Sequence, residues 1–229
     1  MRYAAVVALG AIVPEGKAAV DGLARGLVDD DWFVSLSAAQ ALQCFGERAR
    51  PAVPALINAL GPRDLVKDFR PVRCGEAMVA LSRIDPKAKE LEKAFQLMVG
   101  KLLEDERQGS FGARARGARL LGDCGPAALP TVPALVRLLK DPDGDVRVAA
   151  AEALLKISPD PHGEAALGVL AEALKAPDLL VRRRSAEALA GCGVRAKSVL
   201  PGLRAALDDS EPEVRRAAAE AVRKVGEGT

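Results

Sequence analysis

Apolar residues recur at three- and four-residue intervals along most of the chain, and turns rich in Asp, Pro and Gly interrupt them. In the segment 146–157 the apolar positions are 146, 150, 153, 154 and 157, which form one stripe on a helix. The segment 126–140 carries a similar stripe at 129, 132, 135, 136 and 139. The turn 141–145 separates the two segments. The pattern therefore predicts two short amphipathic helices in succession.

This helical pair recurs along the whole chain. Segments related to 146–157 begin at positions 1, 34, 113, 181 and 214, and the pairs 1 and 34, 113 and 146, and 181 and 214 are each 33 residues apart. A further copy begins near position 72, after an insertion at 61–70. One helical pair cannot bury two apolar faces by itself, so neighbouring pairs must stack. The sequence predicts an all-α protein, an α-solenoid of stacked antiparallel helix pairs.

We expect a single array of about six and a half repeats over residues 1–229. The chain opens on the second helix of a pair, so we also expect a further repeat, a partner or a dimer mate to cover the N-terminal end. The predicted half-repeat is 1–13, and the full repeats are approximately 16–46, 49–84, 87–125, 126–157, 160–193 and 195–226.

Four positions of the repeat 126–157 resemble those of a known family: Pro133, Asp141, Val146 and Arg147. The spacing resembles the HEAT repeat, in particular the short bacterial variety related to the phycobilisome lyases. The resemblance implies a right-handed solenoid that acts as a binding scaffold. It also implies that the second helix of each pair lines the concave face.

The same resemblance implies a ladder of hydrogen bonds between adjacent repeats. The acidic turn residue and the arginine six positions later would form it. Asp141 with Arg147 and Asp209 with Arg215 carry the complete pair, whereas Ala176 stands where another aspartate would continue the series.

The turn DPDGD (141–145) also has a second interpretation. Asp141, Asp143 and Asp145 alternate as in a calcium-binding EF-hand loop, and Glu152 occupies the twelfth position. In the second repeat, however, two of the four matching positions are Phe and Gln, and the sixth position here is Val rather than Gly. We therefore interpret the stretch as a turn between helices, with Asp145 as the predicted N-cap of the second helix.

Composition narrows the functional classes. The chain has 33 basic and 31 acidic side chains and a formal charge of +2, which argues against a general affinity for nucleic acid or anionic membranes. No apolar run approaches the roughly 20 residues of a membrane span. Four dispersed cysteines and one histidine do not form a zinc motif and suggest a reducing, cytoplasmic setting. The sequence predicts no cofactor, no metal and no catalytic cluster, hence no enzyme.

The outward positions of the second helices are the candidate binding surface. Positions three and seven of each helix point away from the buried stripe, and this strip is partly apolar in the N-terminal half and charged in the C-terminal half. An aromatic pair adjoins it in the second repeat. The expected partner contacts are Tyr3, Val7, Trp32, Phe33, Leu36, Gln40, Met78, Arg119, Arg183, Glu187 and Arg216.

The sequence thus favours a non-catalytic scaffold that binds a protein or peptide along its concave face. The resemblance leaves one alternative, a phycobilin-lyase-like or chaperone-like subunit. The basic run Arg182–Arg184 with Arg195 leaves another, a nucleic-acid-binding protein. Against the latter, Arg183 has a glutamate four residues on, and the aromatics typical of single-strand binding are scarce.

Overall fold

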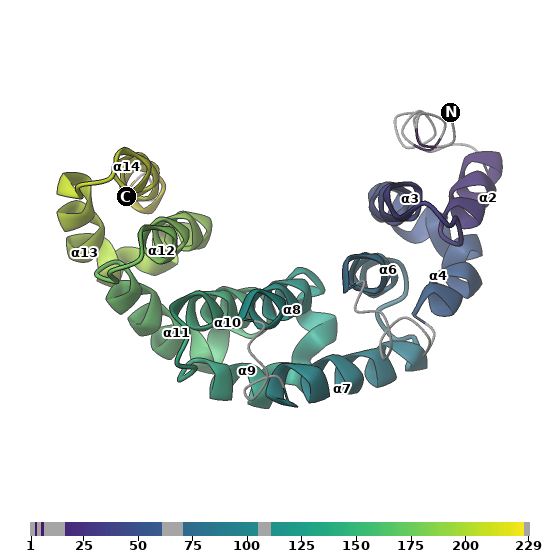
Figure 1. Ribbon diagram of the computed structural model, residues 1–229, viewed down its shortest axis with the longest axis horizontal. Coiled ribbons are helices and arrows are strands. Elements are labelled where there is room, and N and C mark those ends of the chain that lie inside the picture. The colour runs from purple at the N-terminus through teal and green to yellow at the C-terminus, as the bar shows by residue number, and fades with distance from the viewer. Residues whose placement is uncertain (1–2, 4–5, 7–16, 61–70, 105–110, 227–229) are drawn as a thin grey trace. The chain divides into compact units, whose positions relative to one another are not determined.

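The computed structural model describes residues 3, 6, 17–60, 71–104 and 111–226, and all regular elements among them are helices (Figure 1). The half-repeat expected at 1–13, apart from Tyr3 and Val6, and the insertion at 61–70 lie outside the described residues. None of the described helices combines the length and the apolar character that a membrane span requires. The chain divides into two compact units, residues 1–101 with 123–130 and residues 102–122 with 131–229.

The first unit packs short helices around leucine side chains. Leu23, Leu42, Leu56 and Leu81 are fully buried in it. Its elements are α2 (Lys17–Gly26), α3 (Trp32–Phe45), η1 (Gly46–Ala52), α4 (Val53–Ala59), α6 (Pro71–Ile84), most of α7 (Lys89–Glu104) and most of η3 (Gly125–Thr131).

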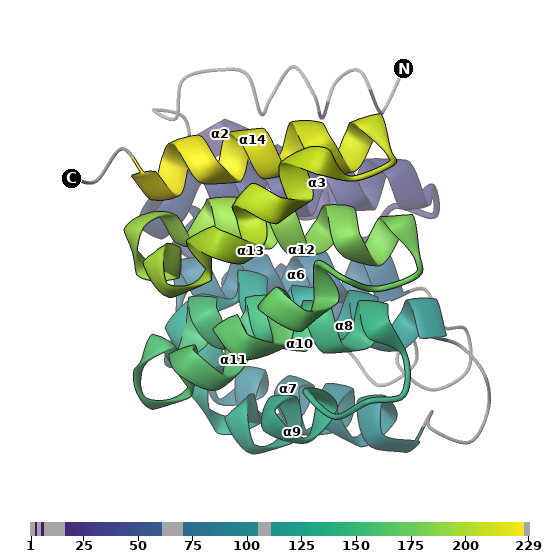
Figure 2. The same ribbon diagram turned by 90° about the vertical axis from the view of Figure 1, so that its left-hand side faces the viewer.

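The second unit has two layers of helices. The first layer contains α8, α10, α12 and α14, and the second layer contains α9, α11 and α13 (Figures 1 and 2). Figure 2 shows α10, α12 and α14 at successive levels with α11 and α13 in front of them. The bounds are α8 (Phe111–Asp123), α9 (Val132–Leu138), α10 (Gly144–Ile157), α11 (Pro159–Ala173), α12 (Leu179–Cys192), η4 (Gly193–Val199), α13 (Leu200–Ala205), η5 (Ala206–Asp208) and α14 (Pro212–Gly226).

Local sequence explains where these helices begin and end. Asp31, Asp143 and Asp178 are the N-caps of α3, α10 and α12, and each accepts a hydrogen bond from a backbone amide of the first turn. Gly46 and Gly193 end α3 and α12 with φ of 52° and 53°, in a region that L side chains rarely adopt. A Pro in the first turn of α4, α9 and α13 costs no hydrogen bond there.

Small residues let the second helices of the second unit approach closely. A Cβ atom at Gly122 of α8 would lie 2.8 Å from the Cα of Ala153 on α10, and one at Gly144 would lie 3.2 Å from the side chain of Val181 on α12. Val146 and Leu154 complete the buried stripe of α10 and are fully buried. The prediction of an all-α fold of stacked helix pairs is confirmed.

Candidate partner-binding site

The N-cap of α10 is Asp143 rather than the predicted Asp145. Asp143 has an extended backbone (φ −81°, ψ 127°), and its Oδ1 accepts hydrogen bonds from the backbone N of Asp145 at 2.8 Å and of Val146 at 3.1 Å. The helix therefore begins at Gly144. Asp145 lies inside the first turn, where its carboxylate is available to arginines on other helices.

The acidic turn is engaged in protein contacts instead of forming a chelating group. Asp141 Oδ1 accepts from the backbone N of Asp143 at 2.9 Å, and Glu152 contacts Lys156 Nζ at 2.7 Å. Across the described residues, no group of three or more His, Cys, Asp or Glu side chains is placed to hold a metal ion.

An arginine near the start of one second helix binds the turn aspartate of the next repeat. Arg182 donates from Nε and Nη2 to Asp209 Oδ2 and Oδ1 at 2.7 and 3.0 Å. Arg114 Nη2 likewise donates to Asp141 Oδ1 at 3.2 Å, and both of these side chains are buried. The Arg182 guanidinium lowers the pKa of the Asp209 carboxyl below its ordinary value, and the backbone N–H of Glu211 adds to this effect.

The structure corrects the predicted ladder pairs. The carboxylates of Asp141 and Asp209 bind the arginine of the preceding repeat, not Arg147 and Arg215. Those two arginines donate from Nη1 to backbone carbonyls of their own turns, at distances between 2.7 and 2.9 Å. Arg182 thus has two tasks, because it closes its own turn through the carbonyl oxygens of Ala176 and Pro177 and binds Asp209 in the next turn. In the turn that follows Arg147, Ala176 occupies the position of the aspartate, so this turn offers Arg147 no carboxylate at that position.

Asp145 joins three second helices. Its Oδ1 lies 2.5 Å from Arg119 Nη2 on α8 and 2.5 Å from Arg184 Nη1 on α12. Two cations share one carboxylate, so the group carries a net charge of +1. The three side chains are between 23% and 36% exposed, and ion pairs that are open to solvent contribute little to stability. The cluster therefore matters more for the charge of the surface than for the fold.

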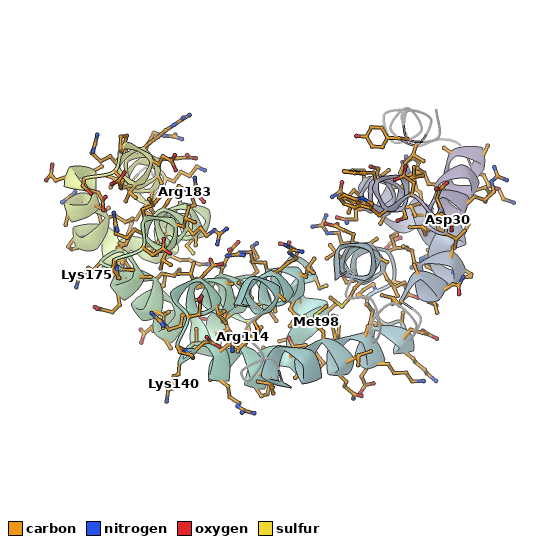
Figure 3. All side chains as sticks on the ribbon, in the orientation of Figure 1. Asp30, Met98, Arg114, Lys140, Lys175 and Arg183 are labelled. Atoms are coloured by element: carbon orange, nitrogen blue, oxygen red, sulfur yellow. The ribbon has the colours of Figure 1, made fainter. Side chains whose placement is uncertain are left out.

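We call the outward side chains of α8, α10, α12 and α14 the second-helix face. Arg183 lies on this side, whereas Lys140 and Lys175 lie on the side of the first helices (Figure 3). Arg183 Nη1 contacts Glu213 of α14 at 2.8 Å, and its Nε contacts Glu187 at 3.5 Å. The pair predicted from spacing is thus present, and a closer contact crosses to the next helix.

Arg216 is exposed on α14, and Glu220, four residues further along this helix, contacts Lys224 Nζ at 2.7 Å.

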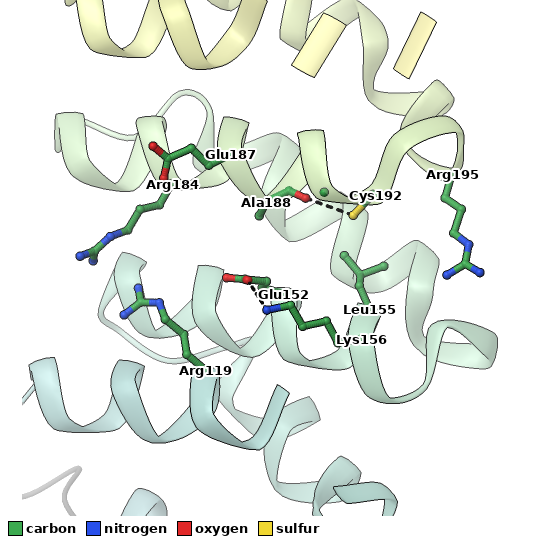
Figure 4. Close-up of a pocket in the computed structure, with 10 residues that line it drawn as sticks. Arg119, Glu152, Leu155, Lys156, Arg184, Glu187, Ala188, Cys192 and Arg195 are labelled. Atoms are coloured by element: carbon green, nitrogen blue, oxygen red, sulfur yellow. Dashed lines mark hydrogen bonds and ion pairs between the residues drawn. The ribbon is translucent and has the colours of Figure 1, made fainter. Parts of the chain in front are cut away.

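A pocket of about 430 Å³ opens on the second-helix face between α8, α10 and α12 (Figure 4). Arg119 and Arg184 lie at one end of it and Arg195, just beyond the end of α12, at the other. Glu152 and Lys156 lie between these ends and contact each other. Each wall of the pocket therefore comes from the second unit alone, and its two ends are positively charged.

The lining of the pocket includes a thiol, that of Cys192, which is not activated. Burial raises the pKa of Cys192, and the nearby carboxylate of Glu152 raises it further. Its Sγ donates to the carbonyl oxygen of Ala188 at 3.3 Å. A thiol with a raised pKa is protonated at neutral pH, and the thiol form is a poor nucleophile.

Three predicted contacts in the first unit are exposed aromatic residues. Tyr3, Trp32 and Phe33 are 51%, 42% and 52% exposed, and the ring centroids of Trp32 and Phe33 lie 3.6 Å apart. The last two occupy the first turn of α3. Trp32 and Phe33 together form an exposed apolar surface of the kind that marks an interface without naming the partner.

The remaining predicted contacts differ in their accessibility. Leu36 is half-buried and Gln40 is exposed, with its amide Nε2 donating to Glu76 Oε1 at 3.4 Å. Met78 is only 1% exposed, which corrects its assignment to the binding surface. The described part of α6 is buried on nearly every side from residue 75 to 82, so position seven does not point outward there. Val7 lies outside the described residues.

Three features of the pocket were not predicted from the sequence. Asp145 binds arginines on two other helices, Gly191 leaves part of the wall open, and Arg195 forms one end. The repeat register selected positions three and seven of each helix, but Arg184 is at position four and Arg195 follows the helix end. The basic run 182–184 was the available signal. The sequence shows that these residues are charged, but it does not show which way their side chains point.

The sequence profile described as HEAT repeats matches residues 96–190 and 167–229, which together span more than half of the chain. No curated protein matches the chain by sequence. Among solved structures, the complex of CpcE and CpcF of phycocyanin lyase from Nostoc sp. PCC7120 is similar, with 23% identity and a TM-score of 0.58. That match covers 96% of this chain and 87% of the other.

Two further structures share the fold. The Escherichia coli protein YibA is 21% identical with a TM-score of 0.54, over 94% of this chain and 72% of its own. The HEAT-like repeat protein of the archaeon Thermococcus onnurineus NA1 is 16% identical with a TM-score of 0.50, over 97% and 92%. At these identities the similarity establishes the fold alone. Together with the profile match, it leads to one assignment: the chain belongs to the HEAT-repeat family.

Proposed function

We propose that the protein is a non-catalytic scaffold that binds a protein partner along the second-helix face of its second unit. The observation that carries this proposal is the pocket between α8, α10 and α12, which charged side chains from three helices line together with apolar groups such as Leu155 and Ala188. Protein interfaces commonly combine an apolar centre with a polar rim. The ion pairs that cross between helices hold the charged side chains in place before a partner arrives.

The chemistry of the pocket supports binding rather than catalysis. A catalytic site needs a nucleophile or titratable groups whose pKa values suit proton transfer. Cys192 has a raised pKa, and Glu152 contacts Lys156. A protonated thiol and an ion-paired carboxylate do not meet this requirement, whereas the charged side chains of the pocket suit the binding of a charged partner. The buried thiol of Cys124 also suits a reducing compartment such as the cytoplasm, where we place the protein.

A pull-down from cells of the source organism tests the scaffold role. The double variant Arg183→Gln with Arg216→Gln removes two charges from the second-helix face. Lys140→Gln with Lys175→Gln removes two from the opposite layer and serves as the matched control. We expect specific partners to be recovered with the wild type and the control and to be lost with the first variant. Equal recovery with all three proteins would contradict binding along this face.

A second candidate is a phycobilin-lyase-like or chaperone-like subunit. It is favoured by the similarity to the CpcE and CpcF complex over nearly the whole chain. An assay of covalent bilin attachment to an apo-phycobiliprotein, with and without the purified chain, separates the two roles. Attachment that depends on this chain would support the lyase-like role, and its absence together with partner recovery would support the scaffold alone.

A further inference from the structure

The two ends of the pocket carry positive charge that the protein leaves uncompensated. At one end Arg119 and Arg184 share the single carboxylate of Asp145. Each guanidinium has five N–H donors, and this contact engages one nitrogen of each. At the other end Arg195 is exposed, and its guanidinium makes no ion pair or hydrogen bond within the described part of the chain.

The centre of the pocket is neutral and partly apolar. Lys156 and Glu152 lie 2.7 Å apart and cancel each other's charge. Leu155 and Ala188 contribute apolar surface between the charged ends, and Gly191 also lines the pocket. A Cβ atom at Gly191 would meet nothing within 4 Å, so this stretch of the wall is open. Glu187 also lines the pocket, and its carboxylate lies 3.5 Å from Arg183 Nε. With both acidic side chains paired, the charge pattern along the pocket is positive, neutral and positive.

We propose that this pocket binds a short acidic peptide segment that carries an aliphatic residue between two carboxylates. One carboxylate binds the pair Arg119 and Arg184, because planar guanidinium groups match carboxylate geometry. The second carboxylate binds Arg195. The aliphatic side chain lies over Leu155 and Gly191. This inference rests on the proposed scaffold function and names the chemistry of the partner.

The pocket favours a peptide over a nucleic acid. Glu152 and Glu187 line it together with the arginines, and their carboxylates would repel a continuous phosphate backbone. Its lining contains no aromatic side chain on which a base could stack. A peptide with separated carboxylates avoids the acidic side chains and still reaches both positive ends.

Fluorescence anisotropy with three labelled probes tests this inference on the full chain. The probes are a peptide of alternating Glu and Leu, a matched peptide of Lys and Leu, and a single-stranded oligonucleotide of the same charge as the acidic peptide. We expect saturable binding of the acidic peptide that weakens as salt rises, and at least about tenfold weaker binding of the other two. No binding of the acidic peptide, or tighter binding of the oligonucleotide, would overturn the inference.

Two variants locate the binding. Arg195→Glu reverses the charge at one end of the pocket, at an exposed position. We expect it to weaken the binding of the acidic peptide at least about fivefold. Gly191→Met fills the open wall and is expected to weaken it by about tenfold or more. Gly168→Met on α11 is the matched control, since a Cβ there also meets nothing within 4 Å. Unchanged affinity in both pocket variants would overturn this site, whether or not the peptide binds elsewhere.

The same variants separate this inference from the scaffold function. If Gly191→Met abolishes peptide binding but still recovers the cellular partners, the pocket binds acidic peptides and the partners use another part of the face, so the inference about the partner fails. If the wild type recovers no partner but binds the peptide at the pocket, the peptide site stands and the scaffold function fails.

Discussion

Asp209 is a residue whose electrostatics depends on the folded stack. Arg182 of the preceding repeat lowers the pKa of its carboxyl, and that contact exists only when the two repeats are packed. A lowered pKa means that the native state favours the ionised form. The corresponding stability is present above the ordinary value of 3.8 and is lost as the pH falls through the lowered value.

We therefore expect Asp209→Asn to destabilise the protein at pH 7 more than at low pH. The difference in the free energy of unfolding between wild type and variant should shrink as the pH is lowered from about 5 toward 2. Urea denaturation at a series of pH values measures it. The exposed Asp208→Asn is the control and should show no such convergence. A difference that is constant with pH would contradict the ionic contact.

The ladder is incomplete at Ala176, and this gap offers a gain of stability. An aspartate there would face Arg147 and could also accept from the backbone N of Asp178, as Asp209 does from Glu211. We expect Ala176→Asp to raise the free energy of unfolding by about 1 kcal/mol. The gain should disappear in the double variant with Arg147→Ala. Thermal and chemical denaturation check both outcomes.

The cysteines should differ in reactivity because their burial differs. Burial raises the pKa of Cys124 to about 12, and this side chain is 5% exposed. Cys44 is exposed on α3. At pH 8 we expect iodoacetamide to alkylate Cys44 in the folded protein and Cys124 only after unfolding, as peptide mass spectrometry would reveal. Alkylation of both at the same rate would mean that the first unit opens easily.

At the scale of elements, the close approach of α8 and α10 depends on one glycine. A Cβ at Gly122 would lie 2.8 Å from the Cα and 3.1 Å from the Cβ of Ala153, so a backbone must move to accept it. We expect Gly122→Ala to lower the free energy of unfolding by about 1–3 kcal/mol. Gly191→Ala, in α12 with open space around it, should instead raise it by about 0.5–1 kcal/mol. Chemical denaturation of the two variants tests this packing. Equal changes in the free energy of unfolding would contradict it.

The helices could be predicted from the sequence because apolar periodicity and turn residues act locally. The stripe from Val146 to Ile157 is buried as expected. The details of the ladder could not be predicted, since an aspartate and an arginine in one turn do not reveal which repeat each side chain faces. The N-cap is Asp143 and not Asp145 for a related reason. Either carboxylate could reach the first backbone amides of the helix, and only the backbone geometry determines which one does.

At the scale of the whole molecule, the described second helices of the second unit present charge in an ordered series. Arg119, Asp145 and Arg184 connect three helices, and Arg183 continues the series to Glu213. No single repeat contains this arrangement. It arises from stacking, which is why the residues of one repeat in isolation could not predict the pocket.

We propose that a partner lies on this second-helix face. Carbodiimide labelling of carboxylates in the free protein and in its complex with a recovered partner tests it most directly. We expect the partner to protect Glu152, Glu187 and Glu213 and to leave Glu164 and Glu172 of α11 as reactive as before. Protection of Glu164 and Glu172, with the other three still labelled, would contradict it.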